Sequence, residues 1–264
     1  MATTARIRVD GAATEYRQEG RGPDLLLLHS LLTEMSVFDR VADPLARSHR
    51  LTRINLPGFG ASSPLALGTV AAYADHVARA MDALELPPGT DVFGNGFGAF
   101  VALELAIGHG ARMRRLMVAD CVPAFPEAAR APFRGMAEKV RANGVGAILD
   151  TAIARMFPPA FQAAHPDIVA ARKAALASAD ASCFAQACLA LAALDLSPRL
   201  TRIRNPALVM CGALDQTTPP ALAREVAQSI GGAVYREIEG CGHCPMLEQP
   251  DALVALIESF TAHG

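Results

Sequence analysis

Short hydrophobic runs alternate with stretches of helical spacing along most of this 264-residue chain. The segment LLLLH at 25–29 is a continuous apolar run, which is typical of a strand buried on both faces. Further strands are predicted at 6–9, 13–18, 50–56, 90–94, 114–120, 206–212 and 233–239, and helices near 37–47, 69–86, 97–107, 219–230 and 251–260. This alternation indicates an α/β protein with a mostly parallel, doubly wound sheet that helices cover on both faces.

The alternation stops between residues 123 and 197, where the chain is rich in alanine and several helices are separated by prolines. We expect a core domain of residues 1–122 plus 198–264, with 123–197 inserted as a helical cap or lid. Such a cap would lie over the carboxyl edge of the strands, where open α/β sheets bind ligands. Its large apolar side chains are expected to form pocket wall or to pack among themselves: Phe125, Phe133, Met136, Met156, Phe157, Phe161 and Phe184.

Composition narrows the class of protein. Apolar residues make up 52% and charged residues 19%, which favours a large folded core over disorder. The net charge is −2, and Lys and Arg are scattered singly, so neither a nucleic-acid partner nor a membrane partner is predicted. Six cysteines without a disulfide pattern and a start that lacks a secretory signal predict a cytoplasmic protein. The sequence leaves the oligomeric state open, and a homo-oligomer is possible.

The segment DVFGNGFGAF at 91–100 predicts a strand, a tight turn and the start of a helix. With four other segments it resembles the α/β-hydrolase family, in the branch of enol-lactonases, cofactor-free haloperoxidases and related small-molecule esterases. LLLLHSLL is similar to the family's strand and His-Gly-x oxyanion loop, and RINLPGFGASSP to its D-x-x-G-x-G-x-S loop. DVFGNGFGAFVALELA resembles the nucleophile elbow, VMCGALDQTTPP the strand end that carries the acid, and IEGCGHCPMLEQPD the loop that carries the histidine.

The resemblance implies roles by position. Asp215 matches the acid of a catalytic triad, His243 matches the histidine, and Gly96 stands where the family has its nucleophilic serine. The backbone N–H groups of Leu31 and Phe97 match the oxyanion hole. A carboxylate that accepts a hydrogen bond from one imidazole nitrogen leaves the other nitrogen free as a base, which supports the pair independently. Taken singly, Asp215 could instead cap the next helix, and His243 could be structural.

Glycine at position 96 keeps the positive-φ turn without strain but leaves the nucleophile position vacant. Three explanations remain open: an engineered substitution of the serine, a natural enzyme whose His-Asp dyad activates water or abstracts a proton, and a catalytically silent ligand-binding homologue. We favour the second. It predicts a cofactor-independent enzyme, without a metal, that acts on a small carbonyl substrate such as an ester, a lactone or an enolisable ketone.

Other side chains are candidates for the pocket. Ser30 occupies a position where the family usually has glycine, and it is expected to reach the pocket mouth but to lie off the usual line of attack. Asn95 and Cys121 are further pocket candidates, and Asp120 is an alternative acid at a strand end. Cys121 also fits a small apolar core residue. The C-x-x-C at 241–244 lacks the context of a redox site, so we interpret it as coincidental.

Overall fold

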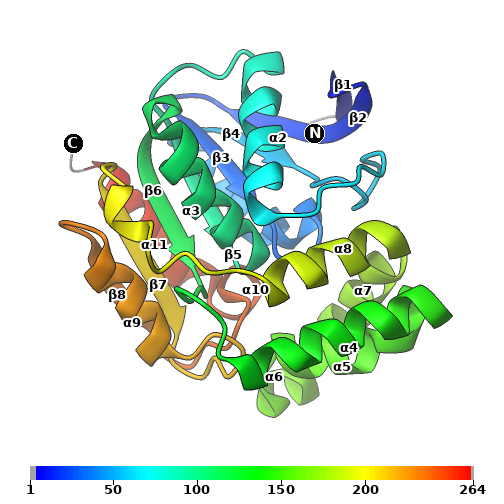
Figure 1. Ribbon diagram of the computed structural model, residues 1–264. Helices are drawn as coiled ribbons and strands as arrows, with labels where there is room; N and C mark the ends of the chain where they lie inside the picture. Colours follow the sequence, from blue (N-terminus) through cyan, green and yellow to red (C-terminus); the bar gives the residue numbers. More distant parts are fainter. Residues whose placement is uncertain (1–3, 263–264) are drawn as a thin grey trace.

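The computed structural model describes residues 4–262. Eight strands form one sheet in the order β1-β2-β4-β3-β5-β6-β7-β8 (Figure 1). The first two strands, β1 (Ala5–Val9) and β2 (Ala12–Gly20), form an antiparallel hairpin, and β2 also pairs antiparallel with β4 (Arg50–Ile54). The other neighbours are parallel: β3 (Asp24–Leu28), β5 (Thr90–Asn95), β6 (Met113–Ala119), β7 (Ala207–Gly212) and β8 (Val234–Ile238). The predicted fold class, α/β with a mostly parallel sheet, is confirmed.

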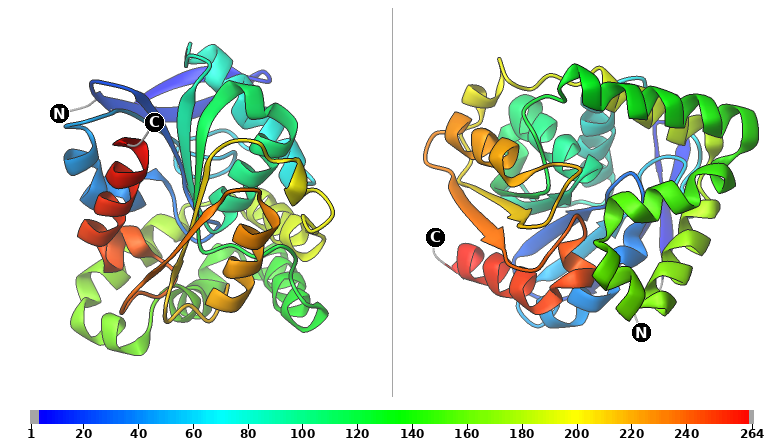
Figure 2. Two further views of the ribbon diagram at one scale, coloured as in Figure 1. Left: turned by 90° about the vertical axis from the view of Figure 1, so that its left-hand side faces the viewer. Right: turned by 90° about the horizontal axis from the view of Figure 1, so that it is seen from below.

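Helices cover both faces of the sheet (Figures 1 and 2). One face carries α2 (Val70–Ala83), α3 (Phe97–His109) and α9 (Pro220–Ser229), and the other carries α1 (Asp39–Leu45) and α11 (Pro250–Ala262). The four leucines of β3 are 0–1% exposed, as expected for a strand between two helical layers. Short elements without a detectable period were not predicted: η1 (Met35–Phe38), η2 (Gly110–Arg112), η4 (Leu200–Arg202) and α10 (Pro245–Glu248).

A group of helices separates β6 from β7 in the sequence. It consists of α4 (Glu127–Asn143), η3 (Val145–Ile148), α5 (Leu149–Met156), α6 (Pro159–Ala164), α7 (Pro166–Ala177) and α8 (Ala181–Ala192), and we call it the α4–α8 segment. Proline stands in the first turn of α6 and of α7, where its missing N–H costs no helical hydrogen bond. The segment lies against the end of the sheet at which the parallel strands terminate (Figures 1 and 2). A bridge between Ala124 and Asp195 joins the two chain stretches that lead into and out of it.

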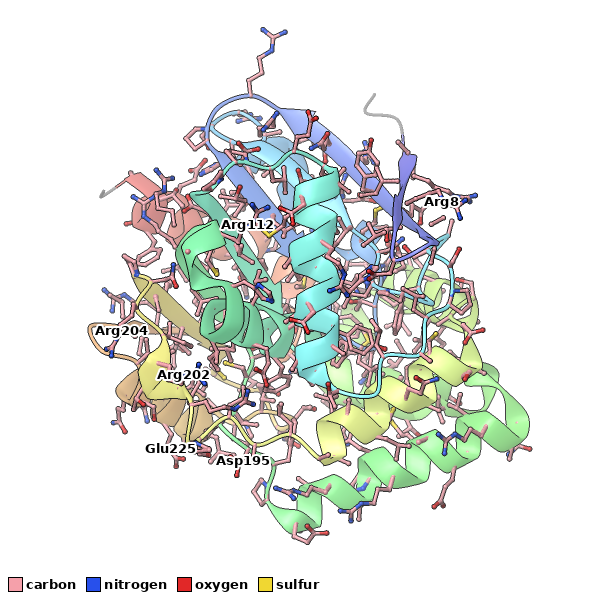
Figure 3. All side chains as sticks on the ribbon, turned by 45° about the horizontal axis from the view of Figure 1, so that its top comes forward. Arg8, Arg112, Asp195, Arg202, Arg204 and Glu225 are labelled. Atoms are coloured by element: carbon pink, nitrogen blue, oxygen red, sulfur yellow. The ribbon has the colours of Figure 1, made fainter. Side chains whose placement is uncertain are left out.

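Charged side chains of both signs share the surface. On the side seen in Figure 3, Arg8, Arg202 and Arg204 are exposed, as are Asp195 and Glu225. Within residues 4–262, no single helix is both long and apolar enough to cross a membrane, and α7 with α8 meets that test only as a pair bent by 102°.

Candidate active site

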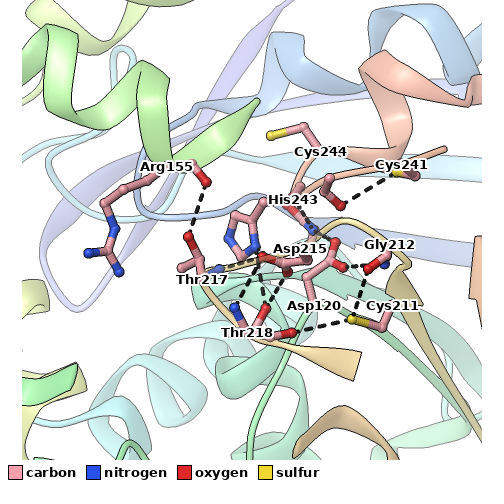
Figure 4. A network of polar contacts seen from close by, with 12 residues as sticks. Asp120, Arg155, Cys211, Gly212, Asp215, Thr217, Thr218, Cys241, His243 and Cys244 are labelled. Carbon is pink, nitrogen blue, oxygen red and sulfur yellow. Dashed lines mark hydrogen bonds and ion pairs between the residues drawn. The ribbon is translucent and has the colours of Figure 1, made fainter. Parts of the chain in front are cut away.

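Asp215 and His243 meet at the carboxyl end of the sheet (Figure 4). Asp215 lies in the loop after β7 and His243 in the loop after β8, so two neighbouring parallel strands deliver the pair to the same edge. His243 Nδ1 lies 2.8 Å from Asp215 Oδ2. A carboxylate can only accept hydrogen bonds, so Nδ1 carries the proton and Nε2 is left as the basic nitrogen.

The loop after β7 fixes the Asp215 carboxylate. The N–H groups of Thr217 and Thr218 donate to Asp215 Oδ1 at 2.7 and 3.1 Å. The Thr218 hydroxyl donates to Oδ2 at 2.5 Å, beside the imidazole. The next helix, α9, has Pro219 as its N-cap and receives no side-chain cap. Asp215 therefore orients the imidazole, and the alternative in which it caps the following helix is wrong.

The pair shifts the protonation of both partners. Burial favours the neutral imidazole, but the charge of Asp215 and its hydrogen bond outweigh burial and raise the pKa of His243. Burial likewise opposes ionisation of Asp215, but the charge of His243 and the donated hydrogen bonds lower the pKa of Asp215. The pairing keeps Asp215 ionised and makes the His243 imidazole a stronger base than an isolated one.

The turn between β5 and α3 has the conformation that the sequence predicted. Gly96 has φ 53° and ψ −116°, a region that residues with a Cβ adopt only under strain. Its N–H donates to the Ala119 carbonyl at 3.0 Å, and its carbonyl accepts from Ala99 and Phe100 at the start of α3. A Cβ at residue 96 would lie 3.1 Å from His243 Nε2, so the basic nitrogen faces this turn.

The position beside Gly96 is not vacant, contrary to the expectation from the sequence. The hydroxymethyl group of Ser30 fills it: a Cβ at residue 96 would lie 2.3 Å from Ser30 Oγ and 3.0 Å from Ser30 Cβ. The Ser30 hydroxyl and the basic nitrogen of His243 therefore flank the same point. Ser30 is 3% exposed, so it lies deeper than the pocket mouth at which the sequence analysis expected it.

His29 holds the backbone of Ser30 in place. Its Nδ1–H donates to the Ser30 carbonyl at 2.8 Å, while its Nε2 accepts from the Leu56 N–H at 3.0 Å. The N–H and hydroxyl of Thr33 donate to the same Ser30 carbonyl at 3.2 and 3.1 Å. Three donors on one carbonyl fix the loop after β3, and they thereby fix the backbone position from which the Ser30 side chain extends.

Two backbone donors border the same spot. Leu31 follows Ser30, Phe97 follows Gly96, and both residues line the cavity next to His243. Within residues 4–262, neither N–H group donates to a protein acceptor. Both residues thus lie at the cavity, and the oxyanion-hole role of their N–H groups stays a prediction from the resemblance.

Asn95 and Asp120 brace the site from behind. The Asn95 side chain donates to Asp120 Oδ2 at 2.7 Å and to the His243 carbonyl at 3.2 Å. Asp120 Oδ1 accepts from the Gly212 N–H at 3.0 Å. Burial, reinforced by the charge of Asp215, raises the pKa of Asp120 to about 8. Asp120 thus links the ends of β5, β6 and β7, whereas Asp215 is the acid that is hydrogen-bonded to the imidazole of His243.

The cysteines do not form a reactive site. Cys121 is fully buried and lines neither cavity beside His243, which fits the small apolar core residue that the sequence analysis allowed. Burial raises the pKa of Cys241 and of Cys244, the opposite of what a redox thiol needs.

Among residues 4–262, one group of side chains has its potential ligand atoms close enough for a metal ion: Asp120, Cys211 and Asp215, within 4.8 Å of one another. The oxygens of both carboxylates are already engaged by the hydrogen bonds described above. The Cys211 thiol donates to the Thr218 carbonyl at 3.3 Å. The group is therefore satisfied without an ion.

Two cavities border His243. The outer one, of about 790 Å³, is lined by α5, the start of α6 and the Asp215 loop, and includes Arg155, Met156, Phe157, Thr217 and His243. The inner one, of about 30 Å³, has room for roughly one or two water molecules. Its lining includes Ser30, Gly96 and three predicted pocket-wall residues, Phe125, Phe133 and Met136. Phe161 and Phe184 line neither cavity.

Residues 25–256 match the sequence profile of the alpha/beta hydrolase family. The chain belongs to this family. This alpha/beta hydrolase is 29% identical to 3-oxoadipate enol-lactonase 2 of Acinetobacter baylyi, over 96% of the chain and 94% of that protein. It is 30% identical to the pimeloyl-[acyl-carrier protein] methyl ester esterase of Aeromonas hydrophila, over 91% of the chain and 96% of that protein. It is also 29% identical to polyketide synthase ThaQ of Burkholderia thailandensis, over 95% of the chain but only 12% of that protein's length.

A solved structure of the family has nearly the same fold. The enol-lactonase of Burkholderia xenovorans superposes with a TM-score of 0.92 and is 27% identical, with 98% of this chain and 100% of that chain covered. Its match over the whole length means that the sheet and the α4–α8 segment of this hydrolase both have counterparts in one known protein.

Several residues that line or support the site were not predicted from the sequence, among them Thr217 and Thr218, which hold Asp215, as well as His29 and Arg155. His29 had a signal, because it directly precedes Ser30 in the oxyanion-loop segment. Arg155 had none: it is one of several arginines in an alanine-rich stretch, and only the folded chain brings it to the same cavities as His243.

Proposed function

We propose that this alpha/beta hydrolase is a cofactor-independent enzyme that acts on a small carbonyl compound, in the first place an ester or a lactone. One observation carries the proposal: an imidazole aligned by a buried carboxylate at 2.8 Å directs its basic nitrogen at the turn where the family has its nucleophile. In this account His243 is the general base and Asp215 orients it.

The attacking oxygen does not come from residue 96, because glycine has no side chain. His243 instead deprotonates another group at the same spot, either a hydroxyl, a water molecule or an acidic C–H of the substrate. The N–H groups of Leu31 and Phe97 stabilise the negative charge that develops on the carbonyl oxygen.

The α4–α8 segment acts as a cap on a core of residues 1–122 plus 198–264. Side chains of α4, α5 and α8 line the inner cavity over Gly96, among them Phe133, Arg155 and Leu191. Because the inner cavity holds about 30 Å³, substrate entry requires these side chains to move. An apolar cover that excludes water strengthens each electrostatic contact inside it.

The names of the relatives support the substrate class. Two are enol-lactonases and one is a methyl ester esterase, so hydrolysis of an ester or lactone bond is the reaction expected first. We also propose a cytoplasmic location, since all six cysteines are free and buried.

Turnover over a panel of compounds tests the proposal. The panel contains p-nitrophenyl butyrate, γ-butyrolactone and an enolisable ketone, 2-pentanone. Proton abstraction from the ketone is measured by deuterium exchange. We expect His243→Ala to lower turnover of at least one compound by about 10²–10⁴-fold, the usual contribution of a positioned base.

The matched control is His109→Ala. His109 also pairs with a carboxylate, Asp75 at 2.7 Å, but the pair lies on the surface at the far end of α3. We expect this variant to keep wild-type turnover. Equal background rates for the wild type and His243→Ala on every compound would instead favour a catalytically silent binding protein.

A further inference from the structure

We propose that Ser30 is the nucleophile of this hydrolase, so that the hydroxyl missing from residue 96 is supplied by the opposite loop. The inference deepens the proposed function and rests on it, because it requires His243 to act as a base.

The position of the hydroxyl is the first reason. A Cβ at residue 96 would lie only 2.3 Å from Ser30 Oγ, closer than any non-bonded approach allows, so the Ser30 side chain occupies the volume of the missing one. The same point lies 3.1 Å from His243 Nε2. The Ser30 hydroxyl and the basic nitrogen of His243 therefore approach one point beside Gly96 from two sides.

The second reason is the exchange of residue types. By the pattern of the family, glycine is usual at the Ser30 position and serine at the Gly96 position, and this chain has them the other way round. Serine at both positions would place two side chains in one volume. The two changes therefore compensate each other sterically, and they conserve one hydroxyl at the spot.

The third reason is the symmetry of the backbone donors. Leu31 follows Ser30 as Phe97 follows Gly96, and both N–H groups are free of protein acceptors within residues 4–262. Attack from Ser30 keeps an amide donor on the residue after the nucleophile and a second donor on the facing loop. The three hydrogen bonds on the Ser30 carbonyl hold the loop in position for this role.

The chemistry balances with water as the only co-reactant. The Ser30 Oγ–H proton passes to His243 Nε2, Oγ bonds to the carbonyl carbon, and the carbonyl electron pair moves to the oxygen at the amide donors. That electron pair then re-forms the carbonyl double bond, and the C–O bond to the alcohol portion of the ester breaks. The alcohol leaves with the proton from His243. Water next gives a proton to His243 and attacks the acyl carbon, and Ser30 leaves with that proton, which yields the acid.

Covalent labelling and turnover together test the inference. Wild type, Ser30→Ala and the matched control Ser178→Ala, a surface serine after α7, are treated with a fluorophosphonate and analysed by peptide mass spectrometry. We expect the label on Ser30 in the wild type and in Ser178→Ala. Ser30→Ala is expected to lose the label and at least 10²-fold in ester turnover while retaining its unfolding midpoint.

The exchange variant Ser30→Gly/Gly96→Ser separates this role from a structural one. Removing Ser30 clears the two close contacts at residue 96, so the new serine gains room beside His243. We expect this double variant to hydrolyse esters and to carry the label on residue 96, whereas the single variant Gly96→Ser is expected to do neither well.

The outcomes are distinguishable. Full turnover by Ser30→Ala, together with loss of turnover in His243→Ala, would overturn the role of Ser30 and leave the proposed function intact. A wild type whose turnover depends on Ser30 but that gives neither a label nor an acyl adduct would also overturn covalent attack. Independence of all turnover from His243 would overturn the proposed function itself.

A different observation carries a second inference: we infer that Arg155 binds a carboxylate of the substrate. Arg155 lines both cavities beside His243. Within residues 4–262 its guanidinium has no salt-bridge partner, and its one ring contact is with Phe133, at 5.1 Å from the guanidinium carbon to the ring centre. Its guanidinium nitrogens are not among the buried unpaired atoms, so they are accessible and can donate charge-assisted hydrogen bonds to an anion in the cavity.

The neighbouring acid does not serve as that partner. Asp215 acts on Arg155 through space, but its oxygens are taken by His243, Thr217 and Thr218. In Figure 4 the guanidinium extends away from Asp215 and Thr218. Its five N–H donors thus remain for an acid group on a substrate held at His243.

Equilibrium binding of glutarate tests this inference without any turnover. By calorimetry, we expect the wild type to bind glutarate and Arg155→Met to bind it about 10–100-fold more weakly, the loss typical of a hydrogen-bonded charge. Arg155→Lys should fall between them, and Arg141→Met, an exposed arginine of α4, should match the wild type. Binding of glutaramide as tight as that of glutarate, or unchanged binding by Arg155→Met, would contradict an anion site.

Discussion

Two buried acids, Asp215 and Asp120, lie near the imidazole of His243. The loop after β7 positions Asp215 so that it is the one hydrogen-bonded to Nδ1. Asp215 is held toward Nδ1 by Thr217 and Thr218, whereas Asp120 is bonded to Asn95 and Gly212. Only Asp215 therefore fixes the tautomer that leaves Nε2 basic.

This division predicts different effects of removing each acid. We expect Asp215→Asn to lower kcat/KM by about 10³–10⁴-fold, because the amide favours the wrong tautomer. Asp120→Asn should stay within about tenfold of the wild type, since Asp120 is largely neutral below its raised pKa. Steady-state kinetics on one ester checks both. A larger loss in Asp120→Asn than in Asp215→Asn would mean that the acids are assigned the wrong way round.

At the residue scale, the sequence predicted those site residues whose positions follow from the order of the motifs and from the ends of the strands. Asp215, His243 and Gly96 follow strands that share one edge, so their convergence was foreseeable. The 2.8 Å contact and the Ser30 hydroxyl beside Gly96 were not, because both depend on the relative positions of loops that are far apart in the sequence. Arg155 follows no pattern, since one unpaired arginine among many gives no signal in the sequence.

At the scale of elements, continuous apolar runs identified the central strands because these are buried on both sides. The predicted and observed strands differ by one or two residues at their ends, as with 50–56 against Arg50–Ile54. Elements of three or four residues, such as α10, span too little chain for a period and were missed.

The close packing of α3 on the sheet depends on glycine at the elbow. A Cβ at residue 98 would lie 2.2 Å from the Leu28 carbonyl oxygen and 2.7 Å from that of His29, both rigid backbone atoms. We expect Gly98→Ala to lower the free energy of unfolding by about 1–3 kcal/mol or more. Because α3 would then push on the loop of Ser30, ester turnover should fall as well.

Gly135→Ala is the matched control, measured in the same urea titration. Gly135 lies in α4, and nothing stands within 4 Å of a Cβ there. Alanine at a compatible helical position should stabilise the protein by about 0.5–1 kcal/mol. Equal midpoints for the two alanine variants would show that the elbow tolerates a wider separation of α3 from β3.

At the scale of the whole molecule, the α4–α8 segment is tied to the core beside the site. The His243 N–H donates to the Met156 carbonyl at 3.2 Å, and the Thr217 hydroxyl donates to the Arg155 carbonyl at 3.0 Å. Elsewhere in the segment, Arg172 of α7 donates to Glu34 at 3.3 Å and to the Ser36 hydroxyl at 2.9 Å. The segment is thus anchored to the core at two separate places.

Loosening one anchor should free the segment. We expect Arg172→Met to lower the free energy of unfolding by about 1.5–3 kcal/mol, since a mostly buried charged hydrogen bond is lost. Limited proteolysis within 127–192 should also become faster. Lys173→Met is the control, because its partner Asp150 is 92% exposed, and its unfolding midpoint should match that of the wild type. Identical proteolysis of the two variants would mean that apolar packing alone holds the segment.

The pH dependence of kcat/KM tests most directly whether His243, tuned by Asp215, is the base. The neutral imidazole is the active form, so kcat/KM should rise with pH and level off above the pKa of His243. Asp215 raises that pKa, so Asp215→Asn should move the rising limb to lower pH even as the plateau falls. We expect a larger shift in Asp215→Asn than in Asp120→Asn, because Asp215 raises the pKa of His243 by its charge and a hydrogen bond, whereas Asp120 acts by its charge alone. A rising limb at the same pH in Asp215→Asn and the wild type would contradict this account.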